Sequence, residues 1–270
     1  MLARLGFASA ALDAKLLTGH GLGLDGLALA LRENESVTPA GAEQVAALLQ
    51  RRLSGESVAR IMGEREFFGL PFTLNAATLE PRPETELLVE MALAALPERG
   101  RLLDLGTGTG CIPIAILANQ PDASAVAVDL SAEALKAAEA NAERHGVASR
   151  LELRQGSWFE PLKQKGEECF DLIVSNPPYI ASAIVQTLEP EVRDFDPVLA
   201  LDGGPDGLAP YRIIAREAGD RLTPSGQVLV EIGYDQGAAV SALLLEAGYE
   251  DVSVHTDLNG LDRVVWARHM

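Results

Sequence analysis

Positively charged residues are scarce in this chain. Its 270 residues include 22 Lys and Arg against 39 Asp and Glu, which gives a formal net charge of −17 at pH 7. A surface that follows nucleic-acid phosphates needs clustered cations, and this balance disfavours one. We therefore expect no direct binding to nucleic acid.

Cysteine and long apolar runs are scarce too. Neither Cys111 nor Cys169 has a His or Cys at ligand spacing, so the sequence indicates no disulfide framework, and we expect no metal site. No apolar run reaches the roughly 18 residues of a membrane span, and the first four residues lack the order of a signal peptide. We expect a soluble, cytoplasmic protein that does not bind membranes.

The hydrophobic pattern divides the chain into three parts. Residues 1–66 show apolar residues at three-to-four spacing and no strand-like alternation, which predicts a small helical domain. The segment 67–80 begins with aromatic and β-forming residues, so we predict a hairpin linker. Residues 81–270 then form the second domain, and Arg82 near its start could face a ligand cleft.

The second domain alternates strands and helices, which predicts an α/β fold. Expected strands are 101–105, 125–129, 150–155, 170–175 and 226–232, and expected helices begin near 111, 132, 210 and 236. Two final strands, 251–255 and 263–267, are too close together to need a crossover helix. We therefore predict a mostly parallel sheet with an antiparallel edge strand.

A glycine loop follows the first of these strands. Gly106, Thr107, Gly108, Thr109 and Gly110 lie between a strand and a helix, where glycines let a ligand approach the backbone closely. Such a loop suits a nucleotide-type ligand, NAD included, and can also be only a tight turn.

Two further residues extend this prediction to an adenosine. Asp129 closes the next strand, where its carboxylate can accept both hydroxyls of a ribose, and Ser131 is already available as the helix cap. Trp158 follows the third strand and could cover an adenine face, although an ordinary hydrophobic plug explains it too.

The most specific motif is Asn176-Pro177-Pro178-Tyr179, at the end of the fourth strand. Successive prolines cannot continue a strand ladder, so nearby carbonyls are left to accept hydrogen bonds from a ligand. A carboxamide oxygen, a free carbonyl and an aromatic ring suit a flat group that carries an NH2. We predict that Asn176, Pro177 and Tyr179 act in catalysis and that all four residues bind the substrate.

Several motifs in order make the chain resemble class I S-adenosylmethionine-dependent methyltransferases, and within them the peptide chain release factor glutamine methyltransferases. The resemblance rests on residues 81–86 (Pro-Arg-Pro-Glu-Thr-Glu), on 104–110, on 176–180, and on Asp257-Leu258-Asn259-Gly260 before Arg263. It covers nearly the whole chain.

The resemblance implies a Rossmann-like fold and methyl transfer from S-adenosylmethionine to the N5 nitrogen of a release-factor glutamine, in its Gly-Gly-Gln loop, which modulates translation termination. It also implies that class 1 release factors are the protein partner. Because residues 1–66 contain none of the cofactor or acceptor motifs and a protein substrate needs a second contact surface, we predict that they form a docking domain. The cofactor contacts would be Gly106 through Gly110, Asp129, Trp158 and Asn176.

Two other substrates stay open on the sequence. A glutamine methyltransferase for a ribosomal protein shares the Asn-Pro-Pro-Tyr motif but departs from the 81–86 motif. A DNA adenine methyltransferase is disfavoured by the net charge of −17. Finally, residues 181–210 show no clear period and follow the acceptor motif directly, so we predict a substrate-facing lid.

Overall fold

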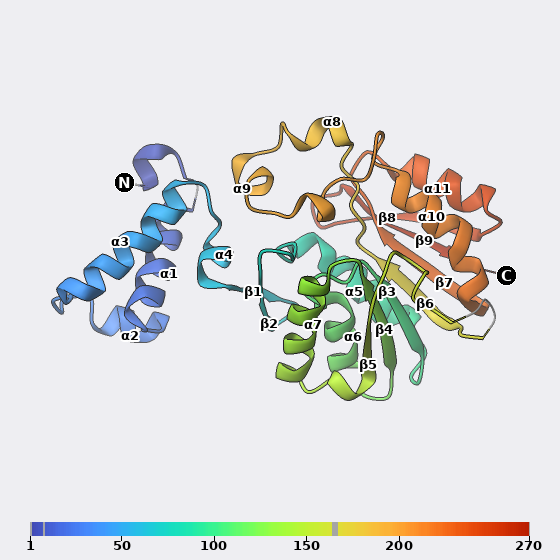
Figure 1. Cartoon of the computed structure of the whole chain (residues 1–270), viewed down its shortest axis with the longest axis horizontal. Coiled ribbons are helices and arrows are strands. Elements are labelled where there is room, and N and C mark those ends of the chain that lie inside the picture. The colour runs from blue at the N-terminus through green and yellow to red at the C-terminus, as the bar shows by residue number, and fades with distance from the viewer. Residues whose placement is uncertain (1, 8, 164–166, 270) are drawn as a thin grey trace.

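The computed structural model describes residues 2–7, 9–163 and 167–269 and shows a helical region beside an α/β region (Figure 1). The helical region comprises η1 (Leu2–Leu5), α1 (Ala10–Leu22), α2 (Gly26–Leu31), α3 (Pro39–Leu53) and α4 (Val58–Met62). The predicted all-helical start of the chain is confirmed.

Short polar residues determine where these helices begin. The side chains of Asp25, Thr38 and Ser57 accept hydrogen bonds from backbone N–H groups three residues later, at the first turns of α2, α3 and α4. Such caps satisfy donors that have no partner within the helix. Gly63 ends α4 with φ of 75°, a left-handed conformation that favours glycine.

A hairpin follows α4 at residues 64–73, starting three residues before the predicted 67–80 linker. Strands β1 (Glu64–Phe67) and β2 (Leu70–Thr73) pair antiparallel. Phe68 and Gly69 both have positive φ, which is the turn geometry that matches strand twist in a two-residue hairpin. Phe67 and Phe72 are buried in one of the two hydrophobic cores of the α/β region, so the linker is attached to it by packing.

The α/β region is built on a seven-stranded sheet in the order β5-β4-β3-β6-β7-β9-β8. Its strands are β3 (Arg101–Leu105), β4 (Ser124–Asp129), β5 (Leu151–Gln155), β6 (Phe170–Ser175), β7 (Leu222–Glu231), β8 (Glu250–Thr256) and β9 (Asp262–Arg268). The first five strands pair in parallel, and β9 pairs antiparallel with both β7 and β8. The mostly parallel sheet is confirmed, and the reversed strand lies one place in from the edge.

Helices cover both faces of this sheet (Figure 1). One face packs against α5 (Glu86–Ala95), α6 (Cys111–Asn119) and α7 (Ala132–Arg144), and the other against α10 (Ala209–Glu217) and α11 (Gly237–Glu246). Short 3-10 turns complete the fold: η2 (Pro83–Thr85), η3 (Ala148–Arg150) and η5 (Ala218–Arg221). Side chains alternate along β3, so Leu102 enters one core and Leu103 the other.

The segment 181–210 lies between the helical region and the sheet (Figure 1). It contains only α8 (Ser182–Val185), α9 (Pro190–Arg193) and η4 (Val198–Ala200) before α10 begins. Arg52 of α3 joins it to the helical region, because its guanidinium donates to Asp13 at 2.7 Å and to Glu191 at 2.8 Å.

A second ionic contact nearby involves Asp196. Its carboxylate accepts from Arg60 of α4 at 2.5 Å and from Arg82 at 2.7 Å. The Asp196 side chain is 3% exposed and that of Arg60 is 8% exposed. One buried carboxylate therefore connects the helical region, the 181–210 segment and the residues that precede α5.

Among the described residues, no helix is both long and apolar enough to cross a membrane.

We expect the substitution Asp196→Ala to lower the free energy of unfolding by about 3 kcal/mol, because it leaves the buried Arg60 guanidinium without its counter-charge. Chemical denaturation monitored by circular dichroism measures this loss. The matched control is Asp194→Ala, two residues away, which removes an exposed carboxylate paired with Arg193 and should leave stability unchanged. Equal effects of the two substitutions would show that the Asp196 contact is not a structural link.

Candidate functional site

The strand order places the site. Strand β3 pairs with β4 on one side and β6 on the other, so the chain changes direction across the sheet at this point. Loops that leave the carboxyl ends of β3 and β6 then diverge, and ligands of parallel α/β sheets bind in the crevice between such loops. A cavity of about 640 Å³ opens at this edge.

The glycine loop after β3 forms one wall of the cavity. Gly106, Thr107, Gly108 and Thr109 line it, whereas Gly110 lies just beyond as the N-cap of α6. Gly106 and Gly108 have positive φ, and a Cβ built on either would meet nothing within 4 Å. The glycines are therefore required by the backbone conformation, and the space over the loop is free for a ligand.

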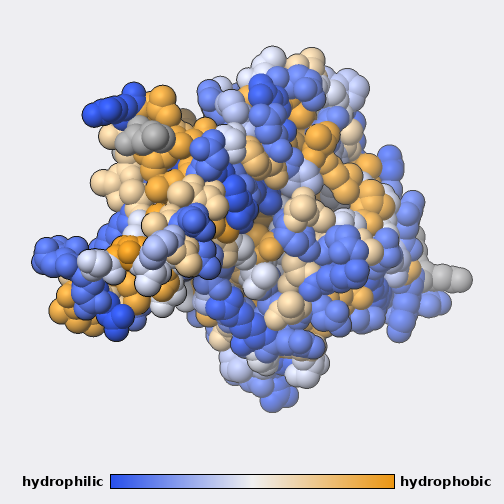
Figure 2. Space-filling view, turned by 60° about the vertical axis from the view of Figure 1, so that its left-hand side comes forward, coloured by the Kyte–Doolittle hydropathy of each residue, from blue (hydrophilic) through white to orange (hydrophobic). Residues whose placement is uncertain are grey.

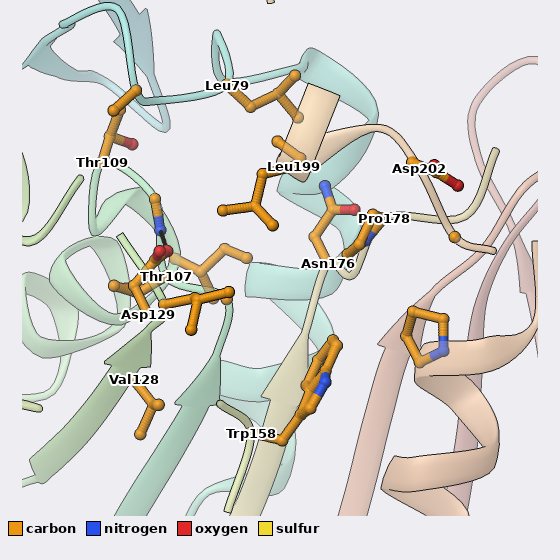
Figure 3. Close-up of a pocket in the computed structure, with 18 of the residues that line it drawn as sticks. Leu79, Thr107, Thr109, Val128, Asp129, Trp158, Asn176, Pro178, Leu199 and Asp202 are labelled. Carbon is orange, nitrogen blue, oxygen red and sulfur yellow. Dashed lines mark hydrogen bonds between the residues drawn. The ribbon is translucent and has the colours of Figure 1, made fainter. Parts of the chain in front are cut away.

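Asp129 lies at the end of β4 and also lines the cavity. Its carboxylate accepts from the backbone N–H of Gly108 and from that of Ser131, each at 2.8 Å. Figure 3 shows Asp129 and Thr107 together on the opposite side of the pocket from Asn176 and Pro178. Asp129 thus braces the glycine loop as well as facing the cavity, a contact that the sequence did not predict.

A buried carboxylate lies beneath this loop. Asp104 is inaccessible to solvent, and neither of its oxygens has a hydrogen-bond partner within the described part of the chain. Burial raises the pKa of Asp104 to about 7. Unpaired carboxylates are costly in a protein interior, and perturbed groups beside a cleft are typical of functional sites.

The Asn-Pro-Pro-Tyr motif follows β6, and the structure separates its four residues. Asn176 and Pro178 line the cavity; Pro177 and Tyr179 are not among its lining residues. Tyr179 packs instead against the core that lies under α10 and α11, where burial raises its pKa to about 12. The Asn176 side-chain NH2 donates to the Thr85 hydroxyl at 3.1 Å.

Trp158 lies at the floor of the pocket, below Asn176 in Figure 3. Its φ of 51° is unusual for a bulky residue, since the left-handed region is strained for side chains with a Cβ. The aromatic ring also packs against the neighbouring core, so both expectations for Trp158, a ligand face and a hydrophobic plug, are compatible with its position.

Two further segments complete the cavity. Leu79, Arg82 and Thr85 approach from the segment before α5, and residues such as Leu199 and Ile213 approach from the 181–210 segment and α10. The suggestion that Arg82 faces the cleft is therefore supported by its position. Leu79 and Leu199 gave no sequence signal, because an isolated leucine in a loop resembles any packing residue.

Two family models match the chain. The methyltransferase small domain matches residues 82–189, and the PrmC N-terminal domain matches residues 1–63. The second match covers the helical region, and the first covers the glycine loop, Asp129 and the Asn-Pro-Pro-Tyr motif.

Curated relatives match over almost the whole chain. A release factor glutamine methyltransferase of Agrobacterium fabrum is 46% identical over 97% of this chain and 92% of its own length. The chain belongs to the release factor glutamine methyltransferase family. Another member, from Cereibacter sphaeroides, is 47% identical over 99% of this chain and 94% of its own length.

Solved structures agree on the fold. The catalytic domain of hMettl16 superposes with a TM-score of 0.61 at 16% identity, over 79% of this chain and 82% of that one. A methyltransferase from Pyrococcus furiosus gives a TM-score of 0.55 at 18% identity, over 83% and 98% of the two chains. The predicted class I methyltransferase fold is confirmed.

The chain is thus a methyltransferase, and its methyl donor is S-adenosylmethionine. The residues present fit this cofactor: the glycine loop leaves open space over its backbone, and Asp129 presents a carboxylate at the end of the adjacent strand. The carboxylate suits the ribose hydroxyls of an adenosine derivative, and the open space over the glycine loop suits the group attached to that ribose.

We expect Asp129→Ala to weaken S-adenosylmethionine binding by about 1–3 kcal/mol, the scale of a hydrogen bond to a charged group. Isothermal titration calorimetry measures this affinity. Asp122→Ala, an exposed carboxylate before the same strand, serves as the control and should bind the cofactor normally. Unchanged affinity in the Asp129 variant would remove this residue from the cofactor site.

Proposed function

We propose that this enzyme transfers a methyl group from S-adenosylmethionine to the N5 amide nitrogen of the glutamine in the Gly-Gly-Gln loop of class 1 release factors, in the cytoplasm. The observation that carries the proposal is the position of Asn176. Its carboxamide projects from the Asn-Pro-Pro-Tyr motif into a cavity shared with the glycine loop and Asp129. Relatives of 42–47% identity carry the corresponding name.

An amide nitrogen is a poor nucleophile, because its lone pair is delocalised into the carbonyl. When bound, S-adenosylmethionine supplies an electrophilic methyl group on a sulfonium. The Asn176 oxygen and the Pro177 carbonyl would each accept one N–H of the substrate amide and aim its nitrogen at that methyl. Such oriented acceptors also favour the positive charge that develops on the nitrogen.

No general base is required by this scheme. The methylated nitrogen is cationic and acidic, so it can release its proton to water. The other proposed roles follow from the same geometry. Gly106 through Gly110 and Asp129 would hold the cofactor, and Trp158 would cover its base. Pro178, which lines the cavity, and Tyr179 would bind the substrate glutamine with Asn176, while the packing of Tyr179 in the core also holds the acceptor loop in shape.

The helical region has a separate role in this proposal. A glutamine on an exposed loop gives a catalytic cleft little surface to hold, whereas specific protein pairs usually bury about 800 Å² on each partner. Four leucines of α1 and α2 are exposed: Leu12, Leu16, Leu27 and Leu31. Figure 2 shows apolar residues at the surface on this side of the molecule. We propose that the 1–66 region docks the release factor.

Competition between substrates tests the proposed function. Transfer of a labelled methyl group is measured on release factor, on ribosomal protein and on DNA, with the same enzyme preparation. Methylation of the release factor at its Gly-Gly-Gln glutamine, located by mass spectrometry, is the expected result. Preferred labelling of ribosomal protein or DNA would overturn the proposal.

We expect Asn176→Ala to reduce kcat by about 10²–10³-fold, the scale of removing one oriented polar group from a transition state. Cofactor affinity and the melting temperature should change little by comparison. Asn119→Ala, at the exposed end of α6, is the control and should keep full activity. Near-normal turnover by the Asn176 variant would contradict the amide-clamp mechanism.

We expect the double substitution Leu27→Glu and Leu31→Glu to raise KM for intact release factor about tenfold, since docking contacts act equally in the ground and transition states. A short Gly-Gly-Gln peptide should be methylated as before. Leu245→Glu, at the far end of α11, introduces a similar charge away from the helical region. If both substrates respond alike in the double variant, the region is not a docking surface.

A further inference from the structure

The Asn176 carboxamide has two ends of similar shape and opposite function. Its oxygen accepts hydrogen bonds and its NH2 group donates them. The proposed reaction uses the oxygen, because the substrate amide nitrogen carries N–H groups. A rotation of 180° about the last side-chain torsion would present N–H groups to N–H groups, so the enzyme needs a device that fixes the orientation.

Thr85 makes the first contact of such a device. Its hydroxyl oxygen lies 3.1 Å from the Asn176 nitrogen, and the residue is 2% exposed. A hydroxyl group has one hydrogen and can either donate to Asn176 or accept from it. Which of the two occurs depends on whether another acceptor takes the Thr85 hydrogen.

Glu231 supplies that acceptor. It ends β7, is 1% exposed, and follows Val230, which pairs with Ser175 in the parallel register of β6 and β7. Glu231 therefore lies beside Asn176 across the sheet. Thr85 and Asn176 both lie close enough to the Glu231 carboxylate to favour its ionised form, although its Oε2 atom has no hydrogen-bond partner among the described residues. An ionised carboxylate can only accept, so a Thr85 hydroxyl that turns its hydrogen toward Glu231 is left to accept from Asn176, which is the contact the structure shows at 3.1 Å.

We propose that Thr85 and Glu231 are positioning residues that orient the Asn176 carboxamide with its oxygen toward the substrate amide. The inference rests on the proposed function, because it assumes that Asn176 receives an amide N–H. It adds to that function a polar chain with one direction, from the Asn176 NH2 through the Thr85 hydroxyl to the Glu231 carboxylate.

The surroundings of Glu231 make this direction depend on pH. Burial raises the pKa of Glu231 to about 7, against the hydrogen bonds from Thr85 and Asn176 and the charge of Arg263, while the charge of Glu84 raises it further. The other titratable side chains whose ionisation Glu231 affects are Tyr179, Tyr211 and Cys111. The pKa of each of these three is raised, so none of them titrates in the neutral range. Asp104, under the glycine loop, also has a pKa of about 7, so a titration at neutral pH is assigned to Glu231 by its loss in Glu231→Gln.

The direction of the pH effect on the Asn176 orientation follows from the chemistry of the Glu231 carboxyl group. Above about pH 7 Glu231 is ionised and accepts hydrogen bonds only, so the hydrogen bonds run from Asn176 through Thr85 to Glu231. Below that pH the protonated carboxyl can donate to Thr85, and the hydroxyl is then free to donate to Asn176. The preference for the productive orientation is lost as the pH falls through the pKa of Glu231.

Nuclear magnetic resonance of the full chain labelled with 15N-asparagine tests the inference without any activity measurement. Loss of a signal in Asn176→Ala identifies the Asn176 side-chain NH2. In the wild type this signal should move with a midpoint near pH 7. In Glu231→Gln it should not move over the same range. A flat signal in the wild type overturns the inference, and this result does not depend on the folding of Glu231 variants.

Kinetics of four variants provide the second test. Glu231→Gln and Thr85→Val should each lower kcat about tenfold, the effect of one hydrogen bond, with KM and cofactor affinity unchanged. Thr85→Ser keeps the hydroxyl and should recover most of the loss. The double variant should show no larger loss of kcat than either single variant, because both substitutions break the same series of hydrogen bonds.

Other outcomes identify a different cause. If Glu231→Gln and Thr85→Val lower the melting temperature and cofactor affinity as much as kcat, the residues are structural and the inference fails. If the wild type shows the amide titration but does not methylate release factor, the proposed function fails while the positioning chain stands. The two failures are therefore distinguishable.

Discussion

The parallel pairing of β3, β6 and β7 is the constraint on which the rest of the structure depends. Parallel strands end at the same edge of a sheet, so their last residues become neighbours although they are far apart in sequence. This pairing brings the Gly106 loop, Asn176 and Glu231 to one edge. A slip of one residue would turn Asn176 to the other face of the sheet and separate it from both.

The helical region is attached to this edge through ionic contacts as well as through the hairpin. Arg52 contacts Glu191, and Arg60 shares the Asp196 carboxylate with Arg82. Since Arg82 lines the cavity, the region proposed to dock the substrate is two side chains away from the site of methyl transfer. Docking and the shape of the cavity wall are therefore physically connected, and removing the helical region would expose a buried charge.

The site combines two kinds of buried acid. Asp104 lies under the glycine loop without a hydrogen-bond partner among the described residues, and Glu231 lies behind the acceptor loop. Burial raises the pKa of each to about 7. Carboxylates whose burial is unfavourable thus lie on both sides of the cavity. Such groups lower the stability of the fold and are typical of functional sites, where they help to arrange the reacting groups.

The sequence by itself determined the fold class, the glycine loop, Asp129 and the Asn-Pro-Pro-Tyr motif, because periodicity and turn residues act over a few neighbours. It could not assign Thr85 or Leu79 to the cavity, and it gave no sign of a role for Glu231 at the end of an apolar strand. Those roles depend on which strands pair, in which register, and how the 181–210 segment folds back. Contacts between distant residues are decided by packing of the whole chain, so only the tertiary structure revealed them.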